Sequence, residues 1–430
     1  MPELNLSYAG RLLSERERFD AFLNGSKDEE KDYLYLSMVR NLYLSFEEIG
    51  IADDVNIIKF FFSFLKDSIL FFFTSPKLST LEDIVILNVY FKYDNELSKR
   101  LQFPLTEIKL EKNVWTKNFT LIKEYSTFLK LTLKLLLNGT LKRAYVIKCI
   151  IPLLRSILIY NKLSLKGVRK IITQRDRYPE ETALILKAKK EGVKTLRIEP
   201  YPSMGAYNRD SIICDYYFYP NEITAGFFKA YPGNSSVKFI KGGFPYWDFL
   251  SEIKHAPILL NDRKIISYWT QYGQEMGIFG NKGPQFYIDE ILSVGGDDYY
   301  LYIKVHPLDD PDNYSKYKDM KNVRVLRHGE VENGHIMSIS EFSFSINSFS
   351  SFESKHVNQN VFFINYDPQL ARDFDYSLVD KYIDVITDRK MLAAFLTGSR
   401  TPKDSSKFIE YFNPSFPHSI DQLKKVVNEI

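Results

Sequence analysis

Two short segments in the second half of the chain carry side chains suited to binding a phosphate group. Each follows a stretch typical of a buried strand: residues 299–305 lead into His306 and Pro307, and residues 342–347 lead into Ser348, Ser350 and Ser351. Ligands of open parallel sheets bind outside the carboxyl ends of the strands, and the hydroxyl and N–H groups that open a helix attract phosphate. Taken singly, a loop histidine and a helix cap are the simpler interpretations. Taken together, these residues predict a nucleotide-phosphate site.

Three carboxylates in the first half of the α/β region lie at or near the ends of other predicted strands, namely Asp176, Glu199 and Asp215. A general base must lie within about 2.6–3.2 Å of the hydroxyl that it deprotonates, and a rigid strand end can hold it there. For each carboxylate alone, a cap or a salt bridge is the simpler interpretation. We take Glu199 and Asp176 as candidate catalytic bases. For a reaction that retains configuration, Asp215 or Asp176 is the candidate nucleophile.

The segment between Glu199 and Asp215 is polar, and Tyr207, Asn208 and Arg209 are candidates for holding a polyhydroxylated or anionic acceptor. No Asp-x-Asp motif stands at a strand end to hold a divalent ion. The acidic residues that follow the His-Pro pair are typical of a solvated turn. We therefore expect a reaction without a metal and without a cofactor.

From residue 170 onward, short β-rich runs alternate with helical patterns. This alternation predicts βαβ units and a largely parallel sheet. It is interrupted by a connector at residues 245–262 and then restarts. We expect an α/β protein of the GT-B type, with two Rossmann-like domains, 161–250 and 263–430, facing each other across a cleft. The chain has no G-x-G-x-x-G and no P-loop motif, which disfavours dinucleotide oxidoreductases and P-loop NTPases.

Residues 1–160 are expected to be mostly helical, as an extension packed on the first of these domains. Residues 55–73 are apolar, but three charged residues lie within them, and each would cost about 2.5–3.5 kcal/mol in a membrane. A buried or interfacial helix is the better interpretation. Residues 126–160 form a basic amphipathic pattern, which suits either packing on the protein itself or peripheral contact with an anionic membrane.

The chain has 430 residues, with 57 Lys and Arg against 54 Asp and Glu, a formal net charge of +3. This balance is too even for a protein that binds nucleic acid through bulk charge, so we expect no nucleic acid partner. The start of the chain lacks the apolar core of a secretory signal. The two cysteines, Cys149 and Cys214, make neither a disulfide framework nor a metal-ligand spacing. A reducing cytoplasm is the simplest compartment.

The pairing of His306-Pro307 in YIKVHP with the later serines of SINSFSSFES resembles bacterial GT-B glycosyltransferases that act on CMP-activated sugars. These are the sialyltransferases, polysialyltransferases and Kdo transferases, and CDP-glycerol glycerophosphotransferases show a similar arrangement. Residues 173–200 are similar to the first-domain pattern of the group, and the resemblance extends over about residues 170–396. The turn Glu199-Pro200 departs from the acidic-acidic-glycine turn of the sialyltransferases, which leaves the base and the donor open.

The resemblance implies that His306 contacts the donor phosphate and assists its departure, and that the serines of the later turn bind the nucleotide. It implies that Glu199 or Asp176 is the catalytic carboxylate. The reaction would move a sialic acid or Kdo-like sugar to a bacterial surface glycan or glycolipid. Two alternatives stay open: a CDP-glycerol or other nucleotide-dependent transferase on the same scaffold, and a non-catalytic interaction protein with two α/β domains.

Overall fold

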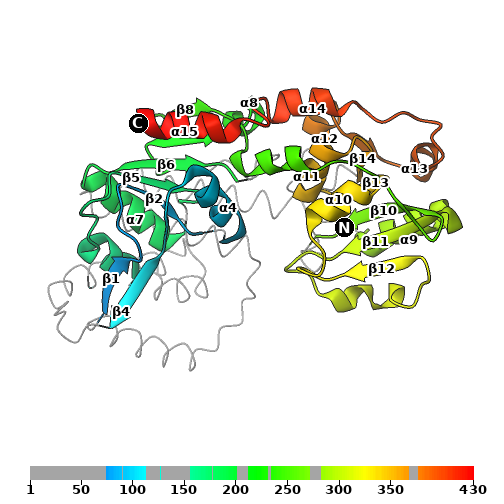
Figure 1. Cartoon of the computed structure of the whole chain (residues 1–430), viewed down its shortest axis with the longest axis horizontal. Helices are drawn as coiled ribbons and strands as arrows, with labels where there is room; N and C mark the ends of the chain where they lie inside the picture. The colour runs from blue at the N-terminus through cyan, green and yellow to red at the C-terminus, as the bar shows by residue number, and fades with distance from the viewer. Residues whose placement is uncertain are drawn as a thin grey trace.

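The structure, a computed structural model, describes residues 74–89, 91–112, 126, 155–176, 178–200, 212–230, 234–271, 282–367 and 376–430. Two large sheets with helices packed around them lie side by side, the N-terminal domain on the left of Figure 1 and the C-terminal domain on the right. Apart from one short antiparallel edge strand, all their strand pairs are parallel. The predicted α/β fold with two Rossmann-like domains is confirmed.

The N-terminal sheet has six strands in the order β3-β2-β5-β6-β7-β8. The strands are β2 (Ile84–Leu87), β3 (Leu105–Thr106), β5 (Lys170–Thr173), β6 (Lys194–Ile198), β7 (Tyr216–Tyr219) and β8 (Lys238–Lys241). Numbered along the chain, this order is 2-1-3-4-5-6, and its topological switch point lies between β2 and β5. The expected ligand position in this domain is therefore the carboxyl end of these two strands.

Three helices connect these strands: α4 (Phe91–Leu101), α7 (Pro179–Lys190) and α8 (Glu222–Lys229). Pro179 stands at the start of α7, where its missing N–H group is not needed by the helix. Gly192 follows the end of α7 with a φ of +75°, a conformation that favours glycine. The predicted helix over this stretch is confirmed.

Residues 84–106 correct the expectation of a mostly helical N-terminal region, because β2 and β3 belong to the first Rossmann-like sheet. A further pair, β1 (Thr74–Leu78) and β4 (Ile108–Lys112), forms a separate antiparallel sheet. The sequence Ile-Val-Ile-Leu of β2 is short and uniformly apolar, so periodicity does not separate a buried strand from a helix there. The first domain therefore begins before residue 161. Residues 55–73 lie outside the described residues.

Of the basic segment 126–160, the structure describes residue 126 and residues 155–160, the latter in a helix that runs to residue 162. Ile157 and Ile159 are fully buried in the core of the N-terminal domain. At this end of the segment, the apolar side chains therefore contact the protein itself. Within the ranges that the structure describes, no helix is both long and apolar enough to cross a bilayer.

The C-terminal sheet has the order β12-β11-β10-β13-β14-β15. The strands are β10 (Arg263–Trp269), β11 (Tyr299–Lys304), β12 (Val323–Leu326), β13 (Phe342–Ser345), β14 (Val361–Ile364) and β15 (Asp384–Ile386), with β9 (Leu259–Leu260) antiparallel on β10. From β10 onward the order is 3-2-1-4-5-6, with the switch point between β10 and β13. Trp269 pairs with Lys304 of β11 and with Ser345 of β13, so the three central strands end at the same level.

The helices of this domain are α9 (Pro284–Gly295), α10 (Asn333–Ile339), α11 (Phe349–Val357), α12 (Tyr376–Val379) and α13 (Arg389–Leu396), with short 3₁₀ turns η5 (Gly296–Asp298) and η6 (Pro311–Tyr317). α10 follows β12 and α11 follows β13, so both helices begin at the carboxyl edge of the sheet. Ser348 caps α11 by accepting a hydrogen bond from the backbone N–H of Ser350.

The connector at residues 245–262 is buried in its first part, whereas most of residues 251–262 are exposed. Its first part is a 3₁₀ helix, η4 (Pro245–Glu252), in which Trp247 is fully buried. The Trp247 ring lies 4.2 Å from Phe244 and 5.1 Å from His356 of α11, measured between ring centroids. One hydrophobic core therefore runs from the N-terminal sheet through η4 into the C-terminal domain.

The end of the chain crosses back to the N-terminal domain. After α14 (Ser405–Phe412), helix α15 (Ser419–Glu429) packs on η4 and α4, and the C-terminus lies near β8 in Figure 1. Lys170 Nζ donates a 2.5 Å hydrogen bond to the carbonyl of Val427, and the Asp248 carboxylate accepts one of 2.7 Å from the N–H of Ile420. These contacts fix helix α15 to the N-terminal sheet and to the connector.

Candidate active site

The switch point of the C-terminal sheet is formed by the residues that follow β10 and β13. The Thr270 hydroxyl accepts a 2.9 Å hydrogen bond from the N–H of His306, and Gln271 Oε1 accepts one of 3.2 Å from the N–H of Asn347. Asn347 Oδ1 is buried and has no hydrogen-bond partner among the described residues. A buried acceptor of this kind calls for a ligand or a water as partner.

His306 is half-buried where β11 ends, beside this switch point. Its Nδ1 accepts a hydrogen bond of 3.1 Å from the N–H of Leu308, so the neutral ring carries its proton on Nε2 and donates from there. Burial lowers the pKa of His306 to about 4, although the nearby Asp309 carboxylate acts in the opposite direction. At neutral pH, His306 is therefore an uncharged hydrogen-bond donor.

The three predicted serines lie at the start of α11 but differ in exposure. Ser348 is buried and acts as the helix cap, and Ser350 is half-buried. Ser351 is fully buried, and its hydroxyl lies 2.7 Å from the hydroxyl of Ser345 inside the domain. Ser348 and Ser350 are therefore the better placed of the three to meet a ligand. Pro307 is exposed directly after His306.

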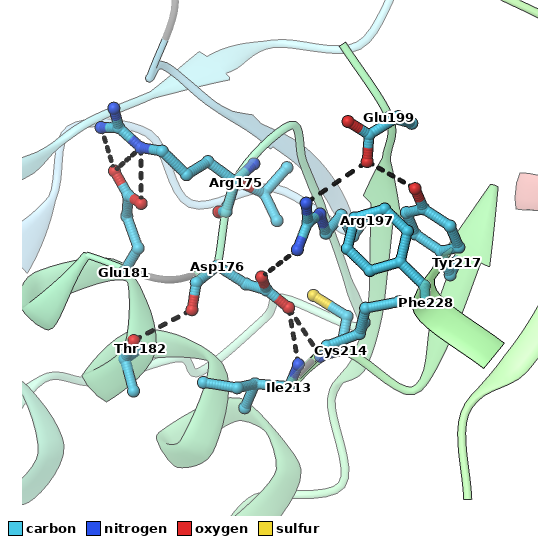
Figure 2. Close-up of polar contacts among 12 residues, drawn as sticks. Arg175, Asp176, Glu181, Thr182, Arg197, Glu199, Ile213, Cys214, Tyr217 and Phe228 are labelled. Carbon is cyan, nitrogen blue, oxygen red and sulfur yellow. Dashed lines mark hydrogen bonds and ion pairs between the residues drawn. The ribbon is translucent and has the colours of Figure 1, made fainter. Parts of the chain in front are cut away.

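Figure 2 shows Arg197 of β6 between the two candidate bases of the N-terminal domain. Its guanidinium lies 2.9 Å from Asp176 Oδ1 and 3.3 Å from Glu199 Oε2. Asp176 Oδ2 also accepts hydrogen bonds from the backbone N–H groups of Ile213 (2.7 Å) and Cys214 (3.1 Å). Asp176 is fully buried, and its carboxylate thus ties the segment before β7 to the end of β5. This geometry suits a structural ion pair better than a base.

Glu199 follows β6 at the carboxyl edge of the same sheet, where 5% of its surface is exposed. The Tyr217 hydroxyl donates to its Oε2, and burial together with this carboxylate raises the pKa of Tyr217 far above its usual value. The Tyr246 hydroxyl of η4 donates to the main-chain carbonyl of Glu199. Glu199 is therefore fixed from the N-terminal sheet and from the connector at once.

Asp215 lies just before β7, at the amino edge of the sheet and thus opposite to Glu199. Its Oδ2 accepts hydrogen bonds from the hydroxyl (2.8 Å) and the N–H (3.0 Å) of Thr195. This position corrects the suggestion that Asp215 acts as a nucleophile, because ligands bind at the other edge. The predicted acceptor residues Tyr207, Asn208 and Arg209 lie outside the described residues.

A cavity of about 780 Å³ separates the two domains. α4 of the N-terminal domain forms one wall, α10 of the C-terminal domain forms the opposite wall, and η4 joins them. Glu353 of α11 adds a carboxylate to its lining. The predicted cleft between two facing domains is thereby confirmed.

Two contacts and one short helical segment link this cavity to the strand ends described above. Tyr246 lines the cavity and binds the main chain of Glu199. Glu353 stands five residues after Ser348 on α11, roughly 7–8 Å along the helix axis. Lys304 Nζ of β11 donates a 2.8 Å hydrogen bond to the carbonyl of Val331, just before α10. The cavity is therefore connected to the carboxyl edges of both sheets through residues that contact them, while Glu199, His306 and Ser348 themselves are not part of its lining.

Several residues of this site were not predicted from the sequence. Thr270 and Gln271 follow a recognisable strand, and a rule that examines every strand end would have found them. Glu181 is a second example: it pairs with Arg175 in Figure 2, and burial raises its pKa to about 7. The cavity walls on α4 and α10 carry no sequence motif, because the packing of two domains brings them together.

No three His, Cys, Asp or Glu side chains of the described residues gather in a group that could hold a metal ion. A reaction without a metal therefore stays a prediction.

No protein-family model and no curated protein matches this sequence. Similar solved structures include a variant of the wall teichoic acid polymerase TagF, with 13% identity, 81% of this chain and 88% of that chain covered, and a TM-score of 0.47. MnaA of S. aureus in a co-structure with UDP has 13% identity, coverage of 81% and 98%, and a TM-score of 0.45. UDP-GlcNAc 2-epimerase of Methanocaldococcus jannaschii, in complex with UDP-GlcNAc and UDP, has 12% identity, coverage of 81% and 99%, and a TM-score of 0.42. The fold of this chain is established by its own strand orders.

Proposed function

We propose that the protein is a glycosyltransferase that uses a nucleotide-activated sugar. One observation carries the proposal: His306 binds Thr270, and Asn347 binds Gln271, at the switch point of the C-terminal sheet. Ligands of open parallel sheets bind at such a switch point. Neighbouring strands lie about 4.8 Å apart, so the ends of β11 and β13 are roughly 10 Å from each other. The donor nucleotide would span these ends, with His306 on one side and Ser348 and Ser350 on the other.

The reaction needs a base for the acceptor hydroxyl and a hydrogen-bond donor for the departing phosphate. Glu199 would accept the proton of the acceptor hydroxyl as its oxygen attacks the anomeric carbon of the donor sugar. The bond from that carbon to the phosphate oxygen would break, and its electron pair would pass to the phosphate. His306, with its proton on Nε2, would donate a hydrogen bond to the charge that develops there.

For the donor, we propose a CMP-activated sialic acid or Kdo-like sugar, and for the acceptor a bacterial surface glycan. The motif around His306-Pro307 and the later serines, which resembles that of CMP-sugar transferases, supports this choice. CDP-glycerol transfer is the second candidate, because CDP-glycerol glycerophosphotransferases resemble this chain through a similar arrangement of these residues.

A thermal-shift titration with CMP, CDP, UDP and GDP, without added metal, tests the proposal. A ligand at 100 times its Kd stabilises a protein by roughly 2.7 kcal/mol, which is readily detected. We expect CMP to raise the melting temperature and His306→Ala to remove most of that rise. His418→Ala, at an exposed position just before α15, is the matched control and should keep it. A response to CDP alone would favour CDP-glycerol, and no response to any nucleotide would contradict the transferase.

A further inference from the structure

The cavity between the domains has the position of a second-substrate site. On one side Tyr246 joins it to Glu199, and on the other Glu353 joins it to the helix that begins at Ser348. A molecule in the cavity would thus contact residues adjacent to the candidate base and to the helix of the candidate donor site. Its volume of about 780 Å³ falls within the roughly 300–1,000 Å³ that is typical of small-molecule sites.

The lining combines aromatic rings with amide side chains. Phe249 of η4 is half-buried in the wall, next to Tyr246, and Asn95 of α4 faces the same space as Asn333 of α10. Aromatic faces give apolar contact area, and amides both donate and accept hydrogen bonds. This combination suits a ring that is apolar on its faces and carries hydroxyl groups on its edge.

The charges that line the cavity leave no surplus of cations. The lining contains four carboxylates, those of Glu96, Glu252, Glu332 and Glu353. It contains three basic side chains, those of Lys99, Arg100 and Lys254. Arg100 is already bound, because its guanidinium lies 2.6 Å from Glu96 and 3.2 Å from Glu252. A site for a phosphate-rich or otherwise polyanionic chain would be expected to carry an excess of free Lys and Arg.

We propose that this cavity binds the acceptor, and that the acceptor is a sugar whose bound part is uncharged or carries an amine, not a polyanion. The inference rests on the proposed transferase function and specifies its acceptor class. Phe249 provides the apolar contact for the sugar ring, and Asn95 and Asn333 hydrogen-bond its hydroxyl groups. Glu332 and Glu252, both exposed at the rim, repel an anionic chain.

A glycan array of uncharged, amine-bearing and polyanionic oligosaccharides, probed with the whole protein and CMP, tests this acceptor class. We expect binding to be confined to the uncharged and amine-bearing sugars. Phe249→Ala should weaken that binding roughly three- to tenfold, as expected for the loss of one aromatic contact. Phe239→Ala is the matched control, because Phe239 is a half-buried aromatic of β8 in the same domain but does not line the cavity.

A second variant tests the charge argument. Glu252→Lys combined with Glu332→Lys changes two rim carboxylates into cations and should admit polyanionic glycans that the wild type excludes. The inference would be overturned by any of three results: the wild type prefers polyanions, the wild type binds no glycan, or Phe249→Ala and Phe239→Ala weaken binding equally. Because CMP binding is measured separately by thermal shift, loss of nucleotide binding with retained glycan binding would instead contradict the transferase function.

Discussion

The guanidinium of Arg197 lies 2.9 Å from the carboxylate of Asp176, inside the N-terminal domain. Both side chains are buried, so this ion pair is shielded from solvent. It joins the ends of two neighbouring strands, β5 and β6, and leaves Glu199 as the better candidate for the base at this edge.

Asp176→Asn is expected to lower the free energy of unfolding by about 3–5 kcal/mol, because it removes the closer of the two carboxylates that pair with the buried guanidinium of Arg197. Urea denaturation measures this change. Glu330→Gln, in an exposed pair with Arg324, is the control and should change it by less than about 1 kcal/mol. An Asp176→Asn protein that is as stable as the wild type, yet inactive, would show that Asp176 acts in catalysis.

Glu199→Gln is expected to reduce the turnover number by roughly 10²–10⁴-fold. It should lower the stability less than Asp176→Asn does, because Arg197 keeps the closer carboxylate of Asp176. The amide keeps an oxygen that can accept from Tyr217, but it cannot take a proton from the acceptor. Rates of sugar transfer and melting temperatures, measured side by side, separate the two effects. Glu222→Gln, on the exposed face of α8, should behave as the wild type. A Glu199→Gln enzyme within threefold of wild-type turnover would exclude Glu199 as the base.

His306 should make the protein sensitive to acid. The pKa of its imidazole is about 4 in the folded protein, against 6.5 in an unfolded chain. Between these values the unfolded chain binds a proton that the folded protein does not, so stability falls as the pH drops from about 6.5 to about 4. In His306→Asn, that part of the decrease should be absent.

Urea denaturation at several pH values between 4 and 7 measures the difference between the two proteins. Burial also lowers the pKa of His356 to about 4. Because both proteins contain His356, its effect on stability is absent from the difference between them. Parallel profiles for wild type and His306→Asn would mean that the imidazole of His306 is not held neutral by burial.

Leu423→Ala is expected to lower the free energy of unfolding by about 2–5 kcal/mol, although only seven residues follow Leu423 in the sequence. Leu423 of α15 is fully buried in the core that η4 and the N-terminal sheet share. Lys425→Ala on the exposed face of the same helix is the control for an altered helix propensity. Equal stability of the two variants would show that α15 does not stabilise the packing of the domains.

The pattern of alternating strands and helices was sufficient to predict both Rossmann-like domains, because buried strands such as β5 and β11 are short apolar runs between clear helix signals. It failed for β2, whose four apolar residues are compatible with either element. His306 and Ser348 could be placed at strand ends because the carboxyl edge of a parallel sheet is fixed by chain direction.

The environment of the carboxylates could not be predicted in this way. Asp176 and Glu199 look alike in the sequence, and both pair with Arg197 in the structure. They are distinguished by the backbone N–H groups before β7, which bind the carboxylate of Asp176. The cavity could not be predicted from the sequence either. Its two walls, α4 and α10, are more than 200 residues apart in the sequence and face each other only in the folded chain.

A crystal structure with CMP bound tests the central claim most directly. We predict density for the nucleotide at the carboxyl ends of β10 and β13, with its phosphate within hydrogen-bond distance of His306 Nε2 and of the first turn of α11. Asn347 Oδ1 should gain a partner in that complex. A nucleotide bound instead at the switch point of the N-terminal sheet, between β2 and β5, would contradict the assignment of the C-terminal domain as the donor site.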